Sequence, residues 1–223
     1  MRFTMPTGRE AARLICGATL AWAAMTAPAL AAIEALAVTT PHPGTIANPP
    51  FTLGWNFTVN EDITLEQLGF YDHNGNGLLD AHAIGLWSSG GSLLRNVTIF
   101  AGDDGELAAS NFRYKDVAPL LLTAGATYVL GATYASGRDA YHFNGPAAFD
   151  AIDQITLIGG VQQNGGFAFP ARPIANSTLI VGPNFRITGD VAPVPEPAAW
   201  ALMILGFGGA GMVLRRRRPL AAA

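Results

Sequence analysis

Apolar and polar side chains alternate along the middle of the chain with a period of two, which is typical of β-strands. In residues 51–59 the apolar side chains occupy the odd positions, from Phe51 to Val59, and Thr, Gly and Asn lie between them. Because successive side chains of a strand point to opposite sides, this pattern predicts a strand with one face in a core. Seven further strands are expected at residues 63–71, 83–87, 93–100, 110–117, 126–134, 152–158 and 178–187.

Turn-forming residues separate these segments, and no helix is expected in the body of the chain. Gly, Asn and Asp supply the backbone conformations that tight turns require. Half of the residues are hydrophobic, which is enough to bury a core. About eight short strands separated by turns predict an all-β fold, an antiparallel β-sandwich or jelly roll. The turns are expected at residues 74–77, 89–91, 103–105, 123–125 and 164–166.

The first 31 residues have the pattern of a secretory signal peptide. Three arginines precede an apolar run at residues 14–25, and an A-x-A cleavage site follows at Ala29 and Ala31. Mature protein is then expected to begin near Ala32. The alternative interpretation is an uncleaved amphipathic helix.

An uncharged segment near the other end predicts a transmembrane helix. Residues 198–214 would form a helix about 26 Å long, which matches the hydrocarbon core of a bilayer. The positive-inside rule predicts that the adjoining arginines stay in the cytoplasm and the body lies outside. A buried core helix is the alternative. The stop-transfer arginines are Arg215, Arg216, Arg217 and Arg218.

The residues before this segment form a short proline-rich motif, Val194, Pro195, Glu196 and Pro197. With the apolar segment and the arginine cluster, they resemble the PEP-CTERM sorting signal of Gram-negative bacteria. The resemblance implies an exosortase, a membrane-embedded cysteine protease, as partner, together with the export machinery and transient insertion in the inner membrane. It also implies a final location at the cell surface or outside the cell, in a biofilm matrix with exopolysaccharide.

These signals divide the chain into four parts. A signal peptide at residues 1–31 is followed by an extended lead-in at residues 32–50 and a β-sandwich domain at residues 51–190. The sorting signal occupies residues 191–223, with the motif at 194–197, the helix at 198–214 and a basic tail at 215–223.

The body also resembles a domain of unknown function that is frequent in PEP-CTERM proteins. Short motifs carry this resemblance, among them residues 68–72, 82–87 and 112–114. The resemblance implies a β-sandwich, and the family supplies no established activity.

Cysteine content and charge exclude several classes of function. The single cysteine, Cys16, lies in the expected signal peptide, so the mature protein would have no disulfide and no thiol nucleophile. Residues 33–194 contain six Lys and Arg against fourteen Asp and Glu, a formal net charge of -8. An acidic body of this kind argues against nucleic acid as a partner.

One loop resembles a calcium-binding pattern. Asp72, Asn74, Asn76 and Asp80 occupy positions 1, 3, 5 and 9 of that pattern, and position 6 is a glycine. Position 12 is Ala83, where the pattern requires a bidentate carboxylate. Asn-Gly pairs are also ordinary hairpin residues, so a simple turn is the alternative. No other cofactor is expected.

Histidines offer candidate acid-base or metal chemistry, but their spacing matches no metal signature. His73, His82 and His142 could in principle join Asp72 or Asp139 in one site. We expect His82 to be a strand-end residue whose ring bonds a neighbouring loop. His142 is expected on an exposed aromatic loop.

Paired carboxylates and aromatic residues raise the possibility of sugar chemistry. Asp103 with Asp104, or Asp150 with Asp153, would suit glycoside hydrolysis if their separation were right, although turn and loop positions explain them equally. A platform for stacking sugar rings is a second possibility, against core packing. The aromatic candidates are Tyr134, Tyr141, Phe143 and Phe149.

The sequence therefore predicts an exported, exosortase-processed, non-catalytic protein of the cell surface or biofilm matrix that associates with exopolysaccharide. The alternative is an exported carbohydrate-active enzyme that uses loop carboxylates.

Overall fold

The computed structural model describes residues 32–45 and 49–188, and these fold almost entirely into antiparallel strands. Two short 3-10 helices, Pro146–Ala148 and Ala175–Ser177, are the helices of this part of the chain. The strands are β1 (Ala32–Glu34), β2 (Leu36–Val38), β3 (Pro43–Gly44), β4 (Phe51–Val59), β5 (Ile63–Tyr71), β6 (His82–Ser88), β7 (Leu93–Ile99), β8 (Glu106–Leu107), β9 (Phe112–Leu122), β10 (Thr127–Tyr134), β11 (Tyr141–Asn144), β12 (Phe149–Ala151), β13 (Ile155–Asn164), β14 (Arg172–Pro173), β15 (Leu179–Val181) and β16 (Pro183–Thr188).

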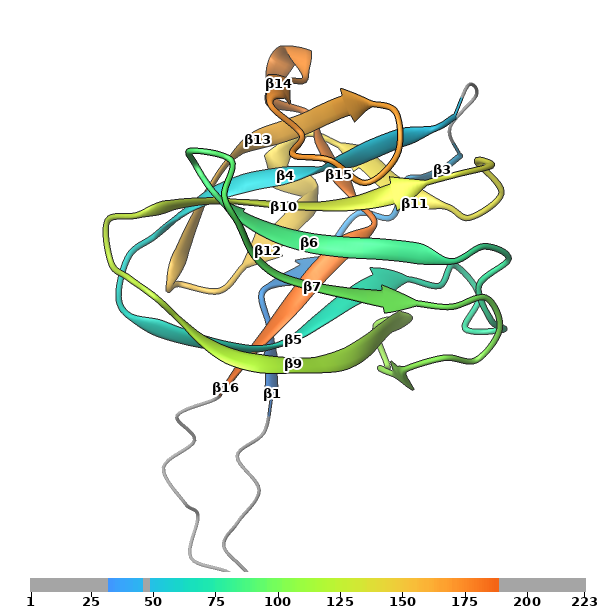
Figure 1. Cartoon of the computed structure of the whole chain (residues 1–223), viewed down its shortest axis with the longest axis horizontal. Coiled ribbons are helices and arrows are strands. Elements are labelled where there is room, and N and C mark those ends of the chain that lie inside the picture. Colours follow the sequence, from blue (N-terminus) through green and yellow to red (C-terminus); the bar gives the residue numbers. More distant parts are fainter. Residues whose placement is uncertain (1–31, 46–48, 189–223) are drawn as a thin grey trace, which may run out of the picture.

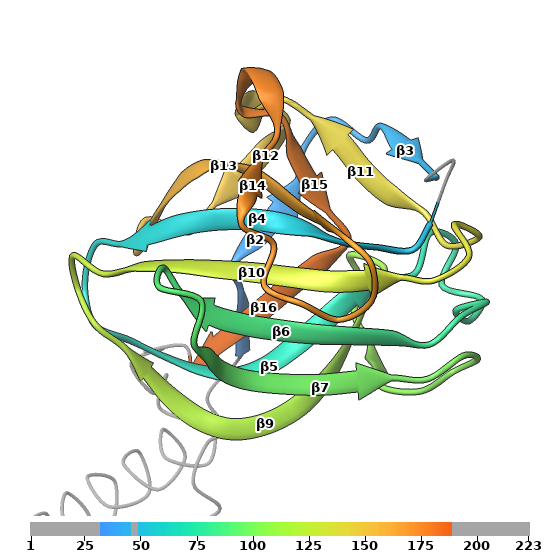
Figure 2. The same cartoon turned by 45° about the horizontal axis from the view of Figure 1, so that its top comes forward.

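Two large sheets pack against each other and form a β-sandwich. One has the strand order β1-β16-β5-β9-β8, and the other has the order β14-β13-β4-β10-β6-β7 (Figure 1). A three-stranded sheet, β15-β11-β3, lies beside them near the top of Figure 2, and β12 pairs with β2. The predicted all-β, antiparallel fold class is confirmed.

The core lies between the two large sheets, and the alternating side chains of β4 supply much of it. Trp55 and Phe57 are fully buried and face Phe185 of the opposite sheet, with ring centroids 5.9 and 5.2 Å from the Phe185 ring. The indole Nε1 of Trp55 donates a hydrogen bond to Pro183 O at 2.9 Å, so the polar atom of this core residue is satisfied. The expectation that one face of residues 51–59 lies in a core is confirmed.

The segment expected to be a lead-in is extended, but it belongs to the sandwich. β1 pairs with β16, β2 with β12 and β3 with β11. Ala35 and Leu36 are completely buried. Within the described residues, the sandwich therefore includes strands β1–β3, which come before residue 51.

A second, smaller apolar cluster lies on the outer side of the six-stranded sheet. It consists of Trp87, Val129 and Val161, with Phe169 packed against them. Next to it, three paired glycines leave a strip of the sheet without side chains: Gly54 on β4, Gly131 on β10 and Gly85 on β6. A Cβ atom on Gly85 would lie 2.5 Å from the Trp87 ring and 2.7 Å from the Phe167 ring. Glycine is thus required where the loop at residues 165–171 covers the sheet.

The strand directions define two ends of the sandwich. Ala32 pairs with Thr188, so both ends of the fold lie at one end, here called the proximal end (Figure 1). The turns at residues 60–62, 89–92, 123–126 and 152–154 lie at the same end of the strands, and those at 60–62 and 152–154 lie beside the end of β16. The opposite, distal end carries the loops at residues 72–81, 100–111 and 135–140.

The predicted signal peptide, transmembrane helix and sorting motif fall outside the described residues. Within residues 32–45 and 49–188, no helix has the length and apolar character needed to cross a membrane.

Candidate functional site

The chemically distinctive side chains of the fold gather at the distal end, and a buried arginine joins two of its loops. Arg113 Nε donates to Asp72 Oδ2 at 2.6 Å, and Arg113 Nη2 donates to Asp103 Oδ1 at 2.7 Å. Arg113 and Asp72 are 3% and 2% exposed. The same Asp72 oxygen accepts the Gly77 N–H at 2.9 Å. These bonds fix the loop at residues 72–81 against the loop at residues 100–105.

A histidine and a carboxylate hold the same loop from the other side. His82 Nδ1 lies 2.6 Å from Thr133 O, and His82 Nε2 lies 3.0 Å from Asp139 Oδ2. The ring therefore bridges strand β10 and the loop at residues 135–140. The Phe70 ring stacks on it at 3.7 Å. The prediction that the His82 ring bonds a neighbouring loop is confirmed.

Asp139 also accepts backbone hydrogen bonds from the loop. Its carboxylate receives the N–H groups of Leu79 and Asp80 at 2.9 and 2.8 Å. Burial raises the pKa of Asp139, but the hydrogen bonds from His82, Leu79 and Asp80 outweigh it and leave the pKa below its ordinary value. Asp139 is therefore an ionised anchor for the loop.

A third, more exposed group of polar side chains at the distal end consists of Arg138, Asp80 and Ser136. Arg138 bonds the carboxylate of Asp80 and donates to Leu79 O at 2.8 Å. Ser136 also donates to Asp80. The hydrogen bond from Arg138 is the main cause that lowers the pKa of Asp80. Two carboxylates of this loop are therefore each paired with an arginine: Asp72 with Arg113, and Asp80 with Arg138.

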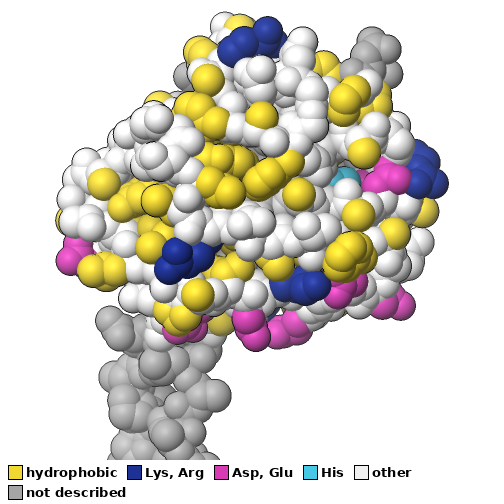
Figure 3. All heavy atoms as spheres, viewed as in Figure 1, with side chains coloured by type: hydrophobic (Ala, Val, Ile, Leu, Met, Phe, Trp, Pro, Cys, Tyr) yellow, Lys and Arg dark blue, Asp and Glu magenta, His cyan; other side chains and the backbone are white. Residues whose placement is uncertain are grey.

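Between these groups lies a pocket of about 210 Å³. Its walls include Asp72, His73, Asn74, Asn76 and Arg138. Leu79, whose side chain is 55% exposed, also lines the pocket. Figure 3 shows acidic, basic and histidine side chains side by side over the distal loops, next to hydrophobic ones. The pocket presents fixed hydrogen-bonding groups beside exposed apolar surface.

The four residues of the predicted calcium loop are close in sequence, but the structure gives both carboxylates cationic partners. Asp72 binds Arg113 and Asp80 binds Arg138. In the part of the chain that the structure describes, no three His, Cys, Asp or Glu side chains are grouped to hold a metal ion. Calcium binding through Asp72, Asn74, Asn76 and Asp80 stays a prediction, which a rise in melting temperature with calcium would test.

The prediction for His142 is wrong. This residue lies on β11 and is 2% exposed. Its Nδ1 accepts the His42 N–H at 3.3 Å, and the Tyr71 ring lies 4.2 Å away. Burial, with smaller contributions from His73 and His42, lowers the pKa of His142 from 6.5 to about 4. His142 is therefore a neutral core residue at physiological pH.

The other candidate residues do not come together in one site. Asp104 binds Lys115 and accepts the Phe100 N–H, a hydrogen bond that lowers the pKa of Asp104. Asp150 and Asp153 are exposed, away from the distal loops. Among the aromatic candidates, Tyr134 and Phe149 are buried in the core, Tyr141 is half-buried and Phe143 is 42% exposed.

Sequence reasoning missed the cations that organise the distal loops. Arg113, Lys115 and Arg138 match no catalytic or metal-binding motif. The available signal was the position of Arg113 between Phe112 and Tyr114, where a charged residue in a buried strand requires an acidic partner.

Comparisons with known proteins give two matches. Residues 38–181 match a domain of unknown function, DUF4082, and residues 193–218 match the PEP-CTERM protein-sorting motif. No curated protein matches the chain.

Proposed function

The chain belongs to the DUF4082 family and carries a PEP-CTERM sorting motif, and from this premise we propose that it is a non-catalytic protein of the cell surface or biofilm matrix that associates with exopolysaccharide. The motif supports an exported protein that is processed by an exosortase.

The geometry of the two ends is the observation that carries it. Thr188 lies at the proximal end and leads toward the sorting motif at residues 193–218. The distal loops project from the opposite end of the strands. The distal pocket therefore lies at the end of the fold opposite to the one that leads toward the sorting motif.

The chemistry of the distal pocket supports a hydroxyl-rich ligand such as a sugar. Asn74 and Asn76 offer amide donors and acceptors, and Arg138 offers guanidinium donors. Leu79 presents apolar surface to the carbon face of a sugar ring. Because Arg113 and Asp139 fix the loop, little conformational entropy would be lost on binding.

The pKa values of the loop carboxyls support a binding role over hydrolysis. A glycosidase needs a carboxylic acid whose pKa is raised, so that it can donate a proton near neutral pH. The pKa values of Asp80, Asp104 and Asp139 are all lowered. These residues are ionised and bonded to cations or N–H groups.

The proposal is tested by retention of the protein, truncated to residues 32–194, on exopolysaccharide of its native host. The wild-type body is expected to be retained without release of reducing ends. Asn76→Ala removes an exposed amide of the pocket and should weaken binding by about tenfold, as for a lost specific hydrogen bond.

Asn96→Ala is the matched control, because Asn96 is exposed on β7 outside the pocket. It should bind like the wild type. Failure of the wild-type body to be retained would contradict the association with exopolysaccharide, and release of reducing ends would favour the carbohydrate-active enzyme.

A further inference from the structure

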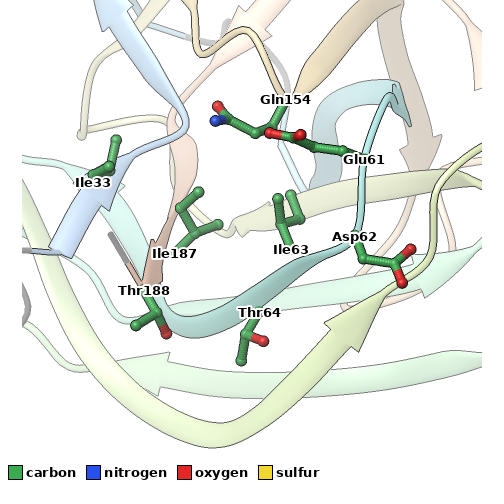
Figure 4. A pocket seen from close by; sticks show the side chains of 8 residues that line it. All are labelled: Ile33, Glu61, Asp62, Ile63, Thr64, Gln154, Ile187 and Thr188. Atoms are coloured by element: carbon green, nitrogen blue, oxygen red, sulfur yellow. The ribbon is translucent and has the colours of Figure 1, made fainter. Parts of the chain in front are cut away.

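A second pocket lies at the proximal end, between the ends of the fold and the turn from β4 to β5. It has a volume of about 300 Å³. Figure 4 shows Ile33, Ile63 and Ile187 around the hollow, with Glu61 and Gln154 above them. Ile63 and Ile187 are 6% and 4% exposed, so they form an apolar floor. Asp62, Thr64 and Thr188 complete the lining.

The charge around this pocket is negative. The four proximal turns, at residues 60–62, 89–92, 123–126 and 152–154, contain Glu61, Asp62 and Asp153 but neither Lys nor Arg. Asp62 accepts the Ala124 N–H at 2.8 Å. Glu61 has no hydrogen-bond partner among the described residues, which leaves its carboxylate available to an external cation.

Chain length brings this end close to the enzyme that processes the sorting motif. Pro195 follows Thr188 by seven residues, and a chain of that length spans at most about 25 Å. Thr188, from which this stretch of chain starts, itself lines the proximal pocket, whereas the distal loops begin at the other end of β16. A protease bound to Pro195-Glu196-Pro197 therefore lies within about 25 Å of Thr188 and of the pocket that Thr188 lines.

We propose that the proximal pocket docks a lysine or arginine side chain on the outward surface of the exosortase, and that the folded body thereby adds to recognition of the sorting motif. The aliphatic part of such a side chain packs on the isoleucine floor, and its charge meets Glu61 at the rim. Anionic lipid headgroups carry the wrong charge for this pocket. The pocket thus fits a basic protein partner better than it fits the membrane surface.

The test uses the full-length precursor in its native host and follows conversion to the processed form by pulse-chase labelling. Glu61→Lys reverses the free charge at the pocket rim and should slow processing by at least about fivefold, as expected from the loss of an ion pair and the added repulsion. Asp150→Lys makes the same charge change on β12, outside the pocket, and should be processed at the wild-type rate. Melting curves of both variants check that each is folded.

A photo-crosslinking residue at Thr64 supplies a second readout. It should give an adduct with the exosortase, and the same residue at Asn96 on β7 should give none. Wild-type processing of Glu61→Lys, equal slowing by Asp150→Lys, or adducts with lipid alone would each overturn the proposal. These outcomes concern the rate of processing, so they are separate from any failure of the released body to bind exopolysaccharide.

Discussion

Replacing Arg113 with alanine is expected to destabilise the fold by about 3–5 kcal/mol, because the substitution leaves the Asp72 carboxylate buried without its cation. Asp72 is 2% exposed, and Arg113 Nε donates to it at 2.6 Å. Only the Gly77 N–H would remain to stabilise the charge on that oxygen. The free energy of unfolding in urea measures the loss.

Asp103→Asn is the matched control for this prediction. Asp103 also binds Arg113, but its side chain is 84% exposed, so its charge is already solvated by water and the ion pair contributes little to stability. We expect a change below about 1 kcal/mol. An equal cost for Arg113→Ala and Asp103→Asn would show that the buried pair with Asp72 does not hold the distal loops.

The protein is also expected to lose up to about 3 kcal/mol of stability between pH 6.5 and pH 4 because of His142. The folded state lowers the pKa of His142 from 6.5 to about 4. Between pH 6.5 and pH 4, His142 is protonated in the unfolded chain but neutral in the folded protein. The free energy of unfolding therefore decreases as the pH is lowered through this range. Below about pH 4 both states are protonated and His142 causes no further loss.

His142→Asn separates this effect from the other titrating groups. The asparagine Oδ1 can still accept the His42 N–H, but the side chain does not titrate. The variant is expected to be less stable at pH 7 and to lose less stability than the wild type between pH 6.5 and pH 4. Parallel stability profiles for the two proteins would contradict the assignment of His142 as a buried neutral residue.

The long strands could be predicted because each follows a local rule. β4 and β5 have the bounds expected from the sequence, since apolar residues recur along each and turns flank both, although the buried positions of β5 shift by one at a β-bulge. The lead-in contains four prolines at residues 39–50 and shows no such pattern. Its strands are specified by distant partners, β11, β12 and β16, which lie about one hundred residues or more along the chain, and no local pattern reports such pairing.

The distal site was predictable in part. The loop beginning at Asp72 was identified from its oxygen-bearing side chains, but the structure assigns that carboxylate to Arg113, forty-one residues further along the chain. His142 was expected to be exposed because aromatic residues flank it. In β11 its side chain is buried and Phe143 is exposed, the reverse of the order that polarity suggests. Burial of a polar residue depends on its partners, which only the fold brings together.

The central claim is that the two ends of the chain are addresses and the acidic β-sandwich between them acts outside the inner membrane. The intact mass of the mature protein, isolated from its native host, tests this claim most directly. The account predicts a product that begins near Ala32 and ends beside Pro195-Glu196-Pro197, with any attached group visible as added mass. Recovery of the whole 23.3 kDa chain from the cytoplasm would contradict it.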